Sequence, residues 1–175
     1  MKILVVSTCQ EKLSEEEFVK PIIKIVGKCD TRHYLEQIDY NQYDKIIICG
    51  TALHDNEFIN EKDNFVWLKD FTKPVLGICS GMQMIGLIFG AELVQKQEIG
   101  LVEVVTKIEN KLFKGIFSAY NLHGNALNLG TTNSFQILAE SQQSVQAIKH
   151  KTKEIYGIIF HPEVRKEDIV KNFIV

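Results

Sequence analysis

The sequence predicts an α/β protein with an open, mostly parallel central sheet flanked by helices and a smaller antiparallel sheet as an extension. In the first half of the chain, short apolar runs alternate with segments of helical spacing, a pattern typical of βαβ units. In the second half, short runs with apolar–polar alternation favour antiparallel strands. Since no linker, internal repeat or low-complexity tract interrupts these patterns, we expect residues 1–175 to form a single domain.

The expected elements follow from apolar runs, helix-start signals and turn residues. Ser14 followed by Glu17 is typical of a capping box and predicts the start of a helix, which Pro21 is expected to bend or break. Gly50 ends a strongly apolar run, and a loop is expected after it. The expected helices cover 14–27, 60–71, 81–90 and 167–174, the loop covers 51–60, and the expected strands cover 2–7, 30–34, 45–49, 74–78, 100–108, 136–139, 146–149 and 155–160.

Composition and charge exclude several classes of function. The 20 basic and 22 acidic residues give a net charge of −2, which argues against a basic face that binds nucleic acid. No apolar run approaches the roughly 20 residues that span a bilayer, and the N-terminal run is shorter than the roughly 7–15 residues of a signal-peptide core. The four cysteines lie 20 or 30 residues apart without a CxxC motif, so we expect no metal site. We also expect no membrane partner and a cytoplasmic location with reduced thiols.

The segment GICSG at 77–81 lies between an apolar strand and a helix, and it matches the nucleophile-elbow pattern with Cys79 in the nucleophile position. The glycines two residues before and after Cys79 leave room for the neighbouring strand and helix, where larger side chains would collide. The N–H groups at the start of a helix carry partial positive charge and favour a thiolate. The backbone N–H of Ser80 would also point at an oxyanion formed beside the sulfur. These features make Cys79 the candidate nucleophile.

A nucleophilic cysteine needs a base, and His161 is the strongest candidate among the five histidines. It follows the apolar run at 155–160 in the sequence FHPEV, where Pro162 favours an extended conformation for the preceding residue. Residues i and i+2 of an extended chain project to the same side, so Glu163 is expected to lie near the imidazole and orient it. The residues alone therefore predict a Cys79–His161–Glu163 triad.

Together these motifs resemble those of the class I (triad) glutamine amidotransferase family. The resemblance rests on PVLGICSGMQMIG around the elbow, on YGIIFHPEV around the base, and on the order of motifs along nearly the whole chain. The sequences LFKGI at 112–116, LHGN at 122–125 and NF at 172–173 are similar to those of the stand-alone glutaminase subunit of GMP synthase. The glutaminase component of anthranilate synthase is the next most similar type.

The resemblance implies an enzyme that hydrolyses the side-chain amide of L-glutamine and passes ammonia to a separate synthetase subunit. By position, Cys79 would be the nucleophile, His161 the general base and acid, and Glu163 the residue that orients His161. No phosphate-binding glycine-rich loop appears in the sequence, so we expect no cofactor in this chain and ATP only in the partner synthetase. The implied substrate-binding residues are Gly50 and Ser80 at the oxyanion hole, Gln83 on the elbow helix, and Gly124 and Asn125 at the α-carboxylate and α-amine end of glutamine. Thr51, next to Gly50, can also present its N–H group to the substrate.

The sequence departs from the family pattern near these residues. The loop CGTALHDN stands where a Gly-Gly-Pro run is usual, and Asn125 stands where the family often has Asp. Neither departure touches the triad, but both leave the acceptor reaction open. An anthranilate-synthase-type glutaminase component and a free-standing γ-glutamyl or other cysteine hydrolase are therefore alternatives. A third alternative is a binding subunit without activity, against which the intact set of triad residues argues.

Overall fold

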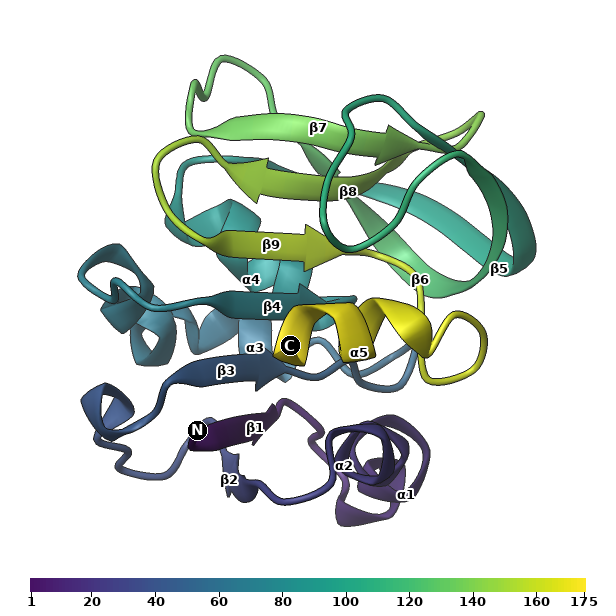
Figure 1. Cartoon of the computed structure of the whole chain (residues 1–175). Helices are drawn as coiled ribbons and strands as arrows, with labels where there is room; N and C mark the ends of the chain where they lie inside the picture. Colours follow the sequence, from purple (N-terminus) through teal and green to yellow (C-terminus); the bar gives the residue numbers. More distant parts are fainter.

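The computed structural model describes residues 1–175 and confirms the predicted α/β class, with helices covering a nine-stranded mixed sheet (Figure 1). The five strands at 30–33, 3–7, 45–48, 75–78 and 155–158 pair parallel in that order, and the remaining strands pair antiparallel. The antiparallel extension is thus confirmed as a continuation of the central sheet. In sheet order the strands are β2 (Asp30–His33), β1 (Ile3–Ser7), β3 (Lys45–Ile48), β4 (Val75–Ile78), β9 (Ile155–Ile158), β8 (Val145–His150), β7 (Phe135–Glu140), β5 (Glu92–Thr106) and β6 (Ile116–Asn128).

Helices cover both faces of the parallel strands. Figure 1 shows α5 (Asp168–Ile174) in front of the sheet and α4 (Ser80–Ile88) behind it. Val5 and Ile47 belong to the core cluster on one face, whereas Leu4 and Ile46 belong to the cluster on the other. Burial on both faces explains why these strands have continuous apolar sequences. One cluster includes residues of α1 (Glu15–Phe18), α2 (Lys20–Val26) and α5 (Asp168–Ile174), and the other includes residues of α3 (Glu57–Asn60), the 3-10 helix η3 (Lys62–Lys69) and α4 (Ser80–Ile88).

The N-terminal helical region differs from the prediction in its start. The Ser14 side chain makes no capping hydrogen bond, so the predicted capping box is wrong, and a short 3-10 turn, η1 (Lys12–Ser14), leads into α1. The break expected from Pro21 is confirmed, because α1 and α2 are separate helices. Pro21 lies in the first turn of α2, where the missing N–H removes no intrahelical hydrogen bond.

Two further segments of the first half differ from the prediction. The helix expected at 60–71 is the 3-10 helix η3, and α3 lies inside the segment expected to be a loop. A further 3-10 turn, η2 (Tyr40–Gln42), precedes β3. The Asp39 side chain accepts a hydrogen bond from the Asn41 N–H and so caps this turn.

The second half contains a strand that the sequence did not predict. β6 pairs with β5 along most of its length, and β5 itself begins at Glu92 rather than at 100. The buried positions of β6 include Asn121 and His123, so its sequence lacks the apolar alternation by which strands are recognised. The strand expected at 155–160 is β9, which pairs parallel to β4 and antiparallel to β8. β9 therefore joins the parallel and antiparallel parts of the sheet, which corrects its assignment to the antiparallel group.

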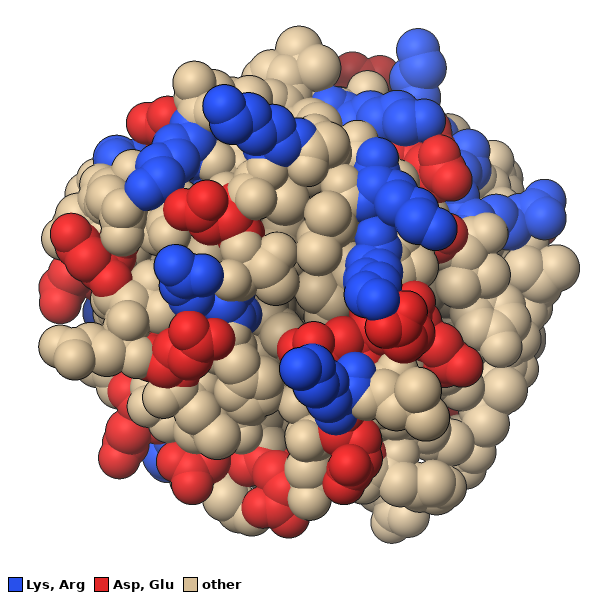
Figure 2. Space-filling model, turned by 90° about the horizontal axis from the view of Figure 1, so that it is seen from below, with Lys and Arg blue, Asp and Glu red and all other residues tan.

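None of the helices has the length and the apolar composition needed to cross a membrane. Figure 2 shows acidic and basic side chains side by side on the face seen from below, in keeping with the net charge of −2. On this face, positive charge does not form a continuous surface.

Candidate active site

Cys79 lies at the sharp turn between β4 and α4, where the elbow pattern places it. Its backbone has φ 50° and ψ −104°, a conformation that residues with a side chain rarely adopt. Both flanking glycines are required by close contacts. A Cβ on Gly77 would lie 2.5 Å from the carbonyl carbon of Gly81, and a Cβ on Gly81 would collide with the carbonyl oxygen of Ile48. Strain of this kind persists where the surrounding structure enforces it, often at functional sites.

Backbone hydrogen bonds to β9 and α4 hold the elbow. The Cys79 N–H donates to the carbonyl of Ile158 in β9 at 2.8 Å, and the Cys79 carbonyl accepts from the Gln83 N–H of α4 at 3.0 Å. The sulfur lies 3.7 Å from the carbonyl oxygen of Leu122 in β6. These bonds place the sulfur at the carboxyl end of the parallel strands, where open α/β sheets bind ligands.

His161 and Glu163 follow β9 and contact each other through their side chains. The His161 N–H donates to the carbonyl of Tyr120 at 2.8 Å, which fixes the backbone at this position. The distance between His161 Nδ1 and Glu163 Oε1 is 2.7 Å, and both side chains are 1% exposed. The second ring nitrogen, Nε2, is buried and has no hydrogen-bond partner in the protein. The structure therefore brings Glu163 beside the imidazole, as the i, i+2 spacing indicates.

Gly50 lies against both Cys79 and His161. A Cβ at this position would lie 2.7 Å from His161 Cε1 and 3.1 Å from Cys79 Cβ. Both side chains therefore crowd the same point after β3, and only glycine fits there. Cys79 and His161, which are far apart in the sequence, are thus neighbours in the fold.

Two opposing effects act on the charge of His161. Burial disfavours the imidazolium, but negative charge on Cys79 and, after it, on Glu163 outweighs burial and raises the pKa of His161 to about 10. The imidazole therefore holds a proton at neutral pH that it can donate. A protonated imidazole can act as a general acid and donate its proton to a leaving group.

Side-chain contacts hold the predicted oxyanion-hole residues around the nucleophile. The Ser80 hydroxyl lies 2.7 Å from Thr8 Oγ1 and donates to the Cys49 carbonyl at 3.0 Å. The backbone N–H of Ser80 belongs to the first turn of α4, where N–H groups have no partner within the helix. Thr51 Oγ1 donates to Asp55 Oδ2 at 2.6 Å. This bond closes the loop that stands in place of the Gly-Gly-Pro run usual in the family.

A narrow cavity of about 10 Å³ lies beside the sulfur and has room for about one water molecule. Five predicted substrate-binding residues line this cavity, whereas Gly50, His161 and Glu163 do not. This cavity is smaller than a glutamine side chain. The lining comprises Thr51, Ala52, Leu53, Asp55 and Asn56 of the loop after β3, Phe58, then Cys79, Ser80 and Gln83 of the elbow, and Leu122, His123, Gly124 and Asn125 of β6.

Two of the predicted substrate-binding residues also contact each other. Gln83 Nε2 donates to the Asn125 carbonyl at 2.9 Å, which ties α4 to β6 across the cavity. Asn125 Nδ2 donates to Asn56 Oδ1 at 3.4 Å and so connects β6 to the loop. Gly124 lies opposite Leu53, whose Cδ1 would be 3.9 Å from a Cβ at Gly124.

Sequence reasoning missed Asp55, which lies in the wall of this cavity. The residue is 8% exposed, and its Oδ2 accepts hydrogen bonds from Thr51 Oγ1 and from the Gln10 N–H. Its Oδ1 is buried without a partner. In the sequence, Asp55 is one of several polar residues of the loop, and no motif distinguishes it.

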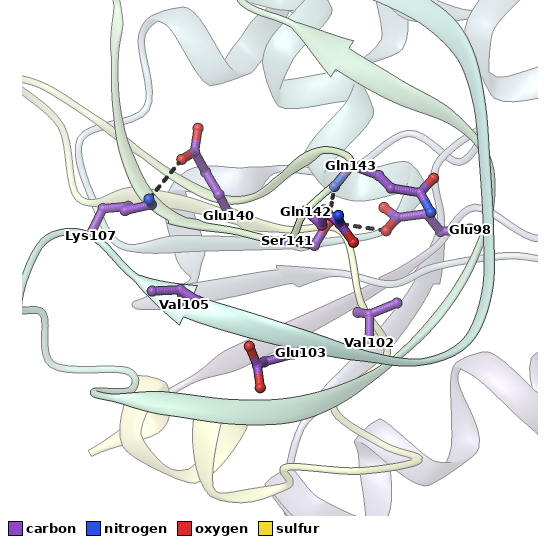
Figure 3. A pocket seen from close by; sticks show the side chains of 9 residues that line it. All are labelled: Glu98, Val102, Glu103, Val105, Lys107, Glu140, Ser141, Gln142 and Gln143. Carbon is purple, nitrogen blue, oxygen red and sulfur yellow. Dashed lines mark hydrogen bonds and ion pairs between the residues drawn. The ribbon is translucent and has the colours of Figure 1, made fainter.

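A second group that the sequence did not reveal lies around Glu98 of β5. Glu98 Oε2 lies 3.3 Å from His123 Nε2, and the two side chains are 3% and 0% exposed. Ser141, Ser144 and Gln146 also donate hydrogen bonds to the Glu98 carboxylate. Figure 3 shows Glu98 and Ser141 in the wall of a second cavity of about 490 Å³. The second cavity contains neither Cys79 nor His161, so its size does not make it the reaction site.

The comparisons agree with this fold. The family model described as glutamine amidotransferase class-I matches residues 18–174. The chain therefore belongs to the class-I glutamine amidotransferase family, and the predicted enzyme class, a glutamine amidotransferase, is confirmed. The chain is 38% identical over 150 residues to a subunit of the glutamine-hydrolysing GMP synthase of Methanocaldococcus jannaschii, a match that covers 79% of this chain and 77% of that protein.

Other relatives match shorter shares of their own length. The corresponding GMP synthase subunit of Methanococcus maripaludis strain S2 is 41% identical over 110 residues, which cover 57% of this chain and 58% of that protein. The GMP synthase of Spiroplasma kunkelii is 33% identical over 152 residues, which cover 80% of this chain and 29% of that protein. Most of the Spiroplasma protein therefore has no counterpart in the matched region.

A solved structure extends the similarity to the whole chain. The crystal structure of a protein from Thermoplasma acidophilum, described as a putative subunit of GMP synthase, superposes with a TM-score of 0.84 and 28% identity. The match covers 99% of this chain and 92% of that chain. The two proteins therefore share their overall fold.

Proposed function

We propose that this chain is the glutaminase component of a GMP synthase, and that Cys79, His161 and Glu163 form its catalytic triad. The contact that supports the triad best is the 2.7 Å approach of Glu163 to His161, both buried, beside a cysteine in a strained elbow. The relatives named as subunits of glutamine-hydrolysing GMP synthases support the choice of acceptor reaction. The proposed role places the chain in purine biosynthesis.

In the proposed first step, the Cys79 sulfur attacks the carbonyl carbon of the glutamine side chain. The oxyanion that forms is stabilised by backbone N–H groups at Gly50, Thr51 and Ser80, each of which is worth roughly 3 kcal/mol if it is well oriented. His161 donates its proton to the amide nitrogen as the C–N bond breaks, and ammonia leaves. Glu163 stabilises the imidazolium before this transfer and keeps the ring oriented.

In the second step, the γ-glutamyl thioester on Cys79 is hydrolysed. The now neutral His161 accepts a proton from water, and the hydroxide attacks the thioester carbon. The C–S bond breaks, glutamate leaves, and the sulfur and the imidazole return to their starting state. Each turnover thus consumes one glutamine and one water and yields one glutamate and one ammonia.

The ammonia is proposed to pass to a separate synthetase subunit. In the Spiroplasma relative, the match to this chain covers only 29% of the protein, which leaves room for a synthetase in the remainder. ATP is proposed to bind to that partner and not to this chain. The substrate of this chain is then L-glutamine alone.

The proposal is tested by measuring glutamate formation from L-glutamine with the isolated chain and with an ATP-dependent GMP synthetase subunit present. We expect weak glutaminase activity alone, a higher rate with the synthetase, and formation of GMP by the mixture. The variant Cys79→Ala should abolish both products. A rate that is high without a partner and favours γ-glutamyl peptides would instead indicate a free-standing hydrolase. Absence of glutamate even with the synthetase would contradict the proposal.

A further inference from the structure

We propose that Asp55 binds the α-ammonium group of glutamine and thereby selects free amino acids over amides that lack this group. The inference rests on the proposed hydrolysis of glutamine and adds a residue that recognises the substrate. The family motifs in this sequence do not include this residue.

The first observation is an unpaired carboxylate oxygen in the cavity wall. Asp55 is 92% buried, since only 8% of its surface is exposed, and Oδ1 has no hydrogen-bond partner. A buried carboxylate oxygen without a hydrogen-bond partner is unfavourable. A cationic N–H donor from a ligand would satisfy this oxygen.

The second observation is the charge of the cavity as a whole. Neither Lys nor Arg lines it, and Asp55 is its one carboxylate. The other titratable groups of the lining are Cys79, the proposed nucleophile, and His123. Burial lowers the pKa of His123, and the carboxylate of Glu98 offsets this only in part, so the imidazole is neutral at pH 7. The cavity therefore favours a ligand that carries a positive charge.

The third observation concerns the opposite wall, formed by β6. The β5–β6 pairing shifts register between Gln95 and Glu98, so Gly124 has no partner residue in the ladder. The main chain of β6 at Gly124 can therefore face the substrate. The Asn125 carbonyl already accepts from Gln83, and the Leu122 carbonyl lies against the sulfur. Among the side-chain oxygens that line the cavity, Asp55 Oδ1 is the buried one without a partner, so it is the acceptor that we assign to the ammonium group.

The structure also gives Asp55 a second role in the loop, which the experiment must separate from substrate recognition. Asp55 Oδ2 holds both the Thr51 hydroxyl and the Gln10 N–H. The variant Asp55→Asn can keep these two bonds through its amide oxygen while it replaces the free oxygen by an NH₂ group. The variant Thr51→Val loosens the same loop but keeps the carboxylate.

The test compares L-glutamine with glutaramate, which is glutamine without its α-amino group, in the presence of the synthetase. For Asp55→Asn we expect kcat/KM for L-glutamine to fall about 10- to 100-fold through KM, because a hydrogen bond to a charged group is lost. The kcat/KM for glutaramate should change less than about twofold. Thr51→Val should affect both substrates alike. The control Glu57→Gln alters an exposed carboxylate two residues away that does not line the cavity, and it should leave both values unchanged.

A readout without turnover separates this inference from the proposed function. Cys79 is labelled either with 6-diazo-5-oxo-L-norleucine, which carries an α-ammonium group, or with iodoacetamide, which does not. Peptide mass spectrometry measures the rate of labelling by each reagent. Asp55→Asn should slow only the first reagent, even if the chain hydrolyses no glutamine. Equal losses with both substrates and both reagents would show that Asp55 acts only through the loop. Unchanged values for L-glutamine and for the first reagent would show that it does not bind the substrate; either result overturns the inference.

Discussion

Tyr120 and Leu122, two alternate residues of β6, present their main-chain carbonyls to the two reactive residues of the site. The Tyr120 carbonyl accepts from the His161 N–H at 2.8 Å, and the Leu122 carbonyl lies 3.7 Å from the Cys79 sulfur. Alternate carbonyls of a strand point in the same direction, so one edge of β6 faces both residues. β6 pairs only with β5 in the sheet, which leaves this edge free. The position of β6 therefore aligns the sulfur with the imidazole.

We expect Glu98→Leu to reduce the free energy of unfolding by about 3 kcal/mol, because His123, Ser141, Ser144 and Gln146 would lose a common buried partner. Urea denaturation at pH 7 measures the change. Glu103→Leu is the matched control, since Glu103 lies on the same strand but is exposed, and its cost should be below about 0.5 kcal/mol. Equal stability of the two variants would contradict a stabilising role for the cluster.

Two replacements of Cys79 distinguish the role of its sulfur in activity from the effect of its strained backbone on stability. Cys79→Gly and Cys79→Ala both remove the sulfur and should abolish glutamine hydrolysis. Only glycine adopts positive φ without strain, so the glycine variant should be about 1–3 kcal/mol more stable than the alanine variant. Thermal and urea unfolding of the two inactive variants provide the comparison. If alanine were as stable as glycine, the elbow would not be strained.

The charge of His161 gives a prediction for pH dependence. Since its pKa is raised to about 10, the imidazole should stay protonated between pH 5 and 8, which NMR titration of the ring protons detects. A pKa above the unfolded value of about 6.5 adds stability that is fully present below about pH 6.5 and is lost as the pH rises toward 10.

The same titration tests the cause of this shift. Cys79→Ala removes the largest favourable contribution to the charged imidazole and should lower the pKa of His161. Glu163→Gln should lower it as well, because it removes the second negative charge. A wild-type imidazole that titrates near pH 6.5 would rule out close contact with the sulfur and the carboxylate.

Gly50→Ala should reduce glutamine hydrolysis by about 100-fold, because the new methyl group would displace His161 or Cys79. Gly157→Ala is the matched control. Its Cβ would also meet a side-chain atom at 2.7 Å, but that atom belongs to Met82 in the core. We expect Gly157→Ala to lower stability with a much smaller effect on kcat at a temperature where both variants are folded. Similar kcat losses in the two variants would argue against a specific role for Gly50.

The sequence was sufficient where the determining interactions are local. The elbow could be predicted because two glycines, a preceding apolar strand and a following helix all lie within a few residues of Cys79. The approach of Glu163 to His161 could be predicted for the same reason, since the two residues are separated only by Pro162. Burial of the parallel strands on both faces explains why they too were recognisable from their continuous apolar runs.

Only the tertiary structure decided which distant groups meet at the site. The buried positions of β6 carry polar side chains such as Asn121 and His123, so its strand character depends on pairing with β5. Asp55 became a candidate because folding buries one of its oxygens in the cavity wall without a partner. Glu98 is one of many charged residues in the sequence, and its buried contact with His123 exists only because the two strands pair at that register. Local patterns thus fixed the candidate nucleophile and base, whereas contacts between remote segments determined their surroundings.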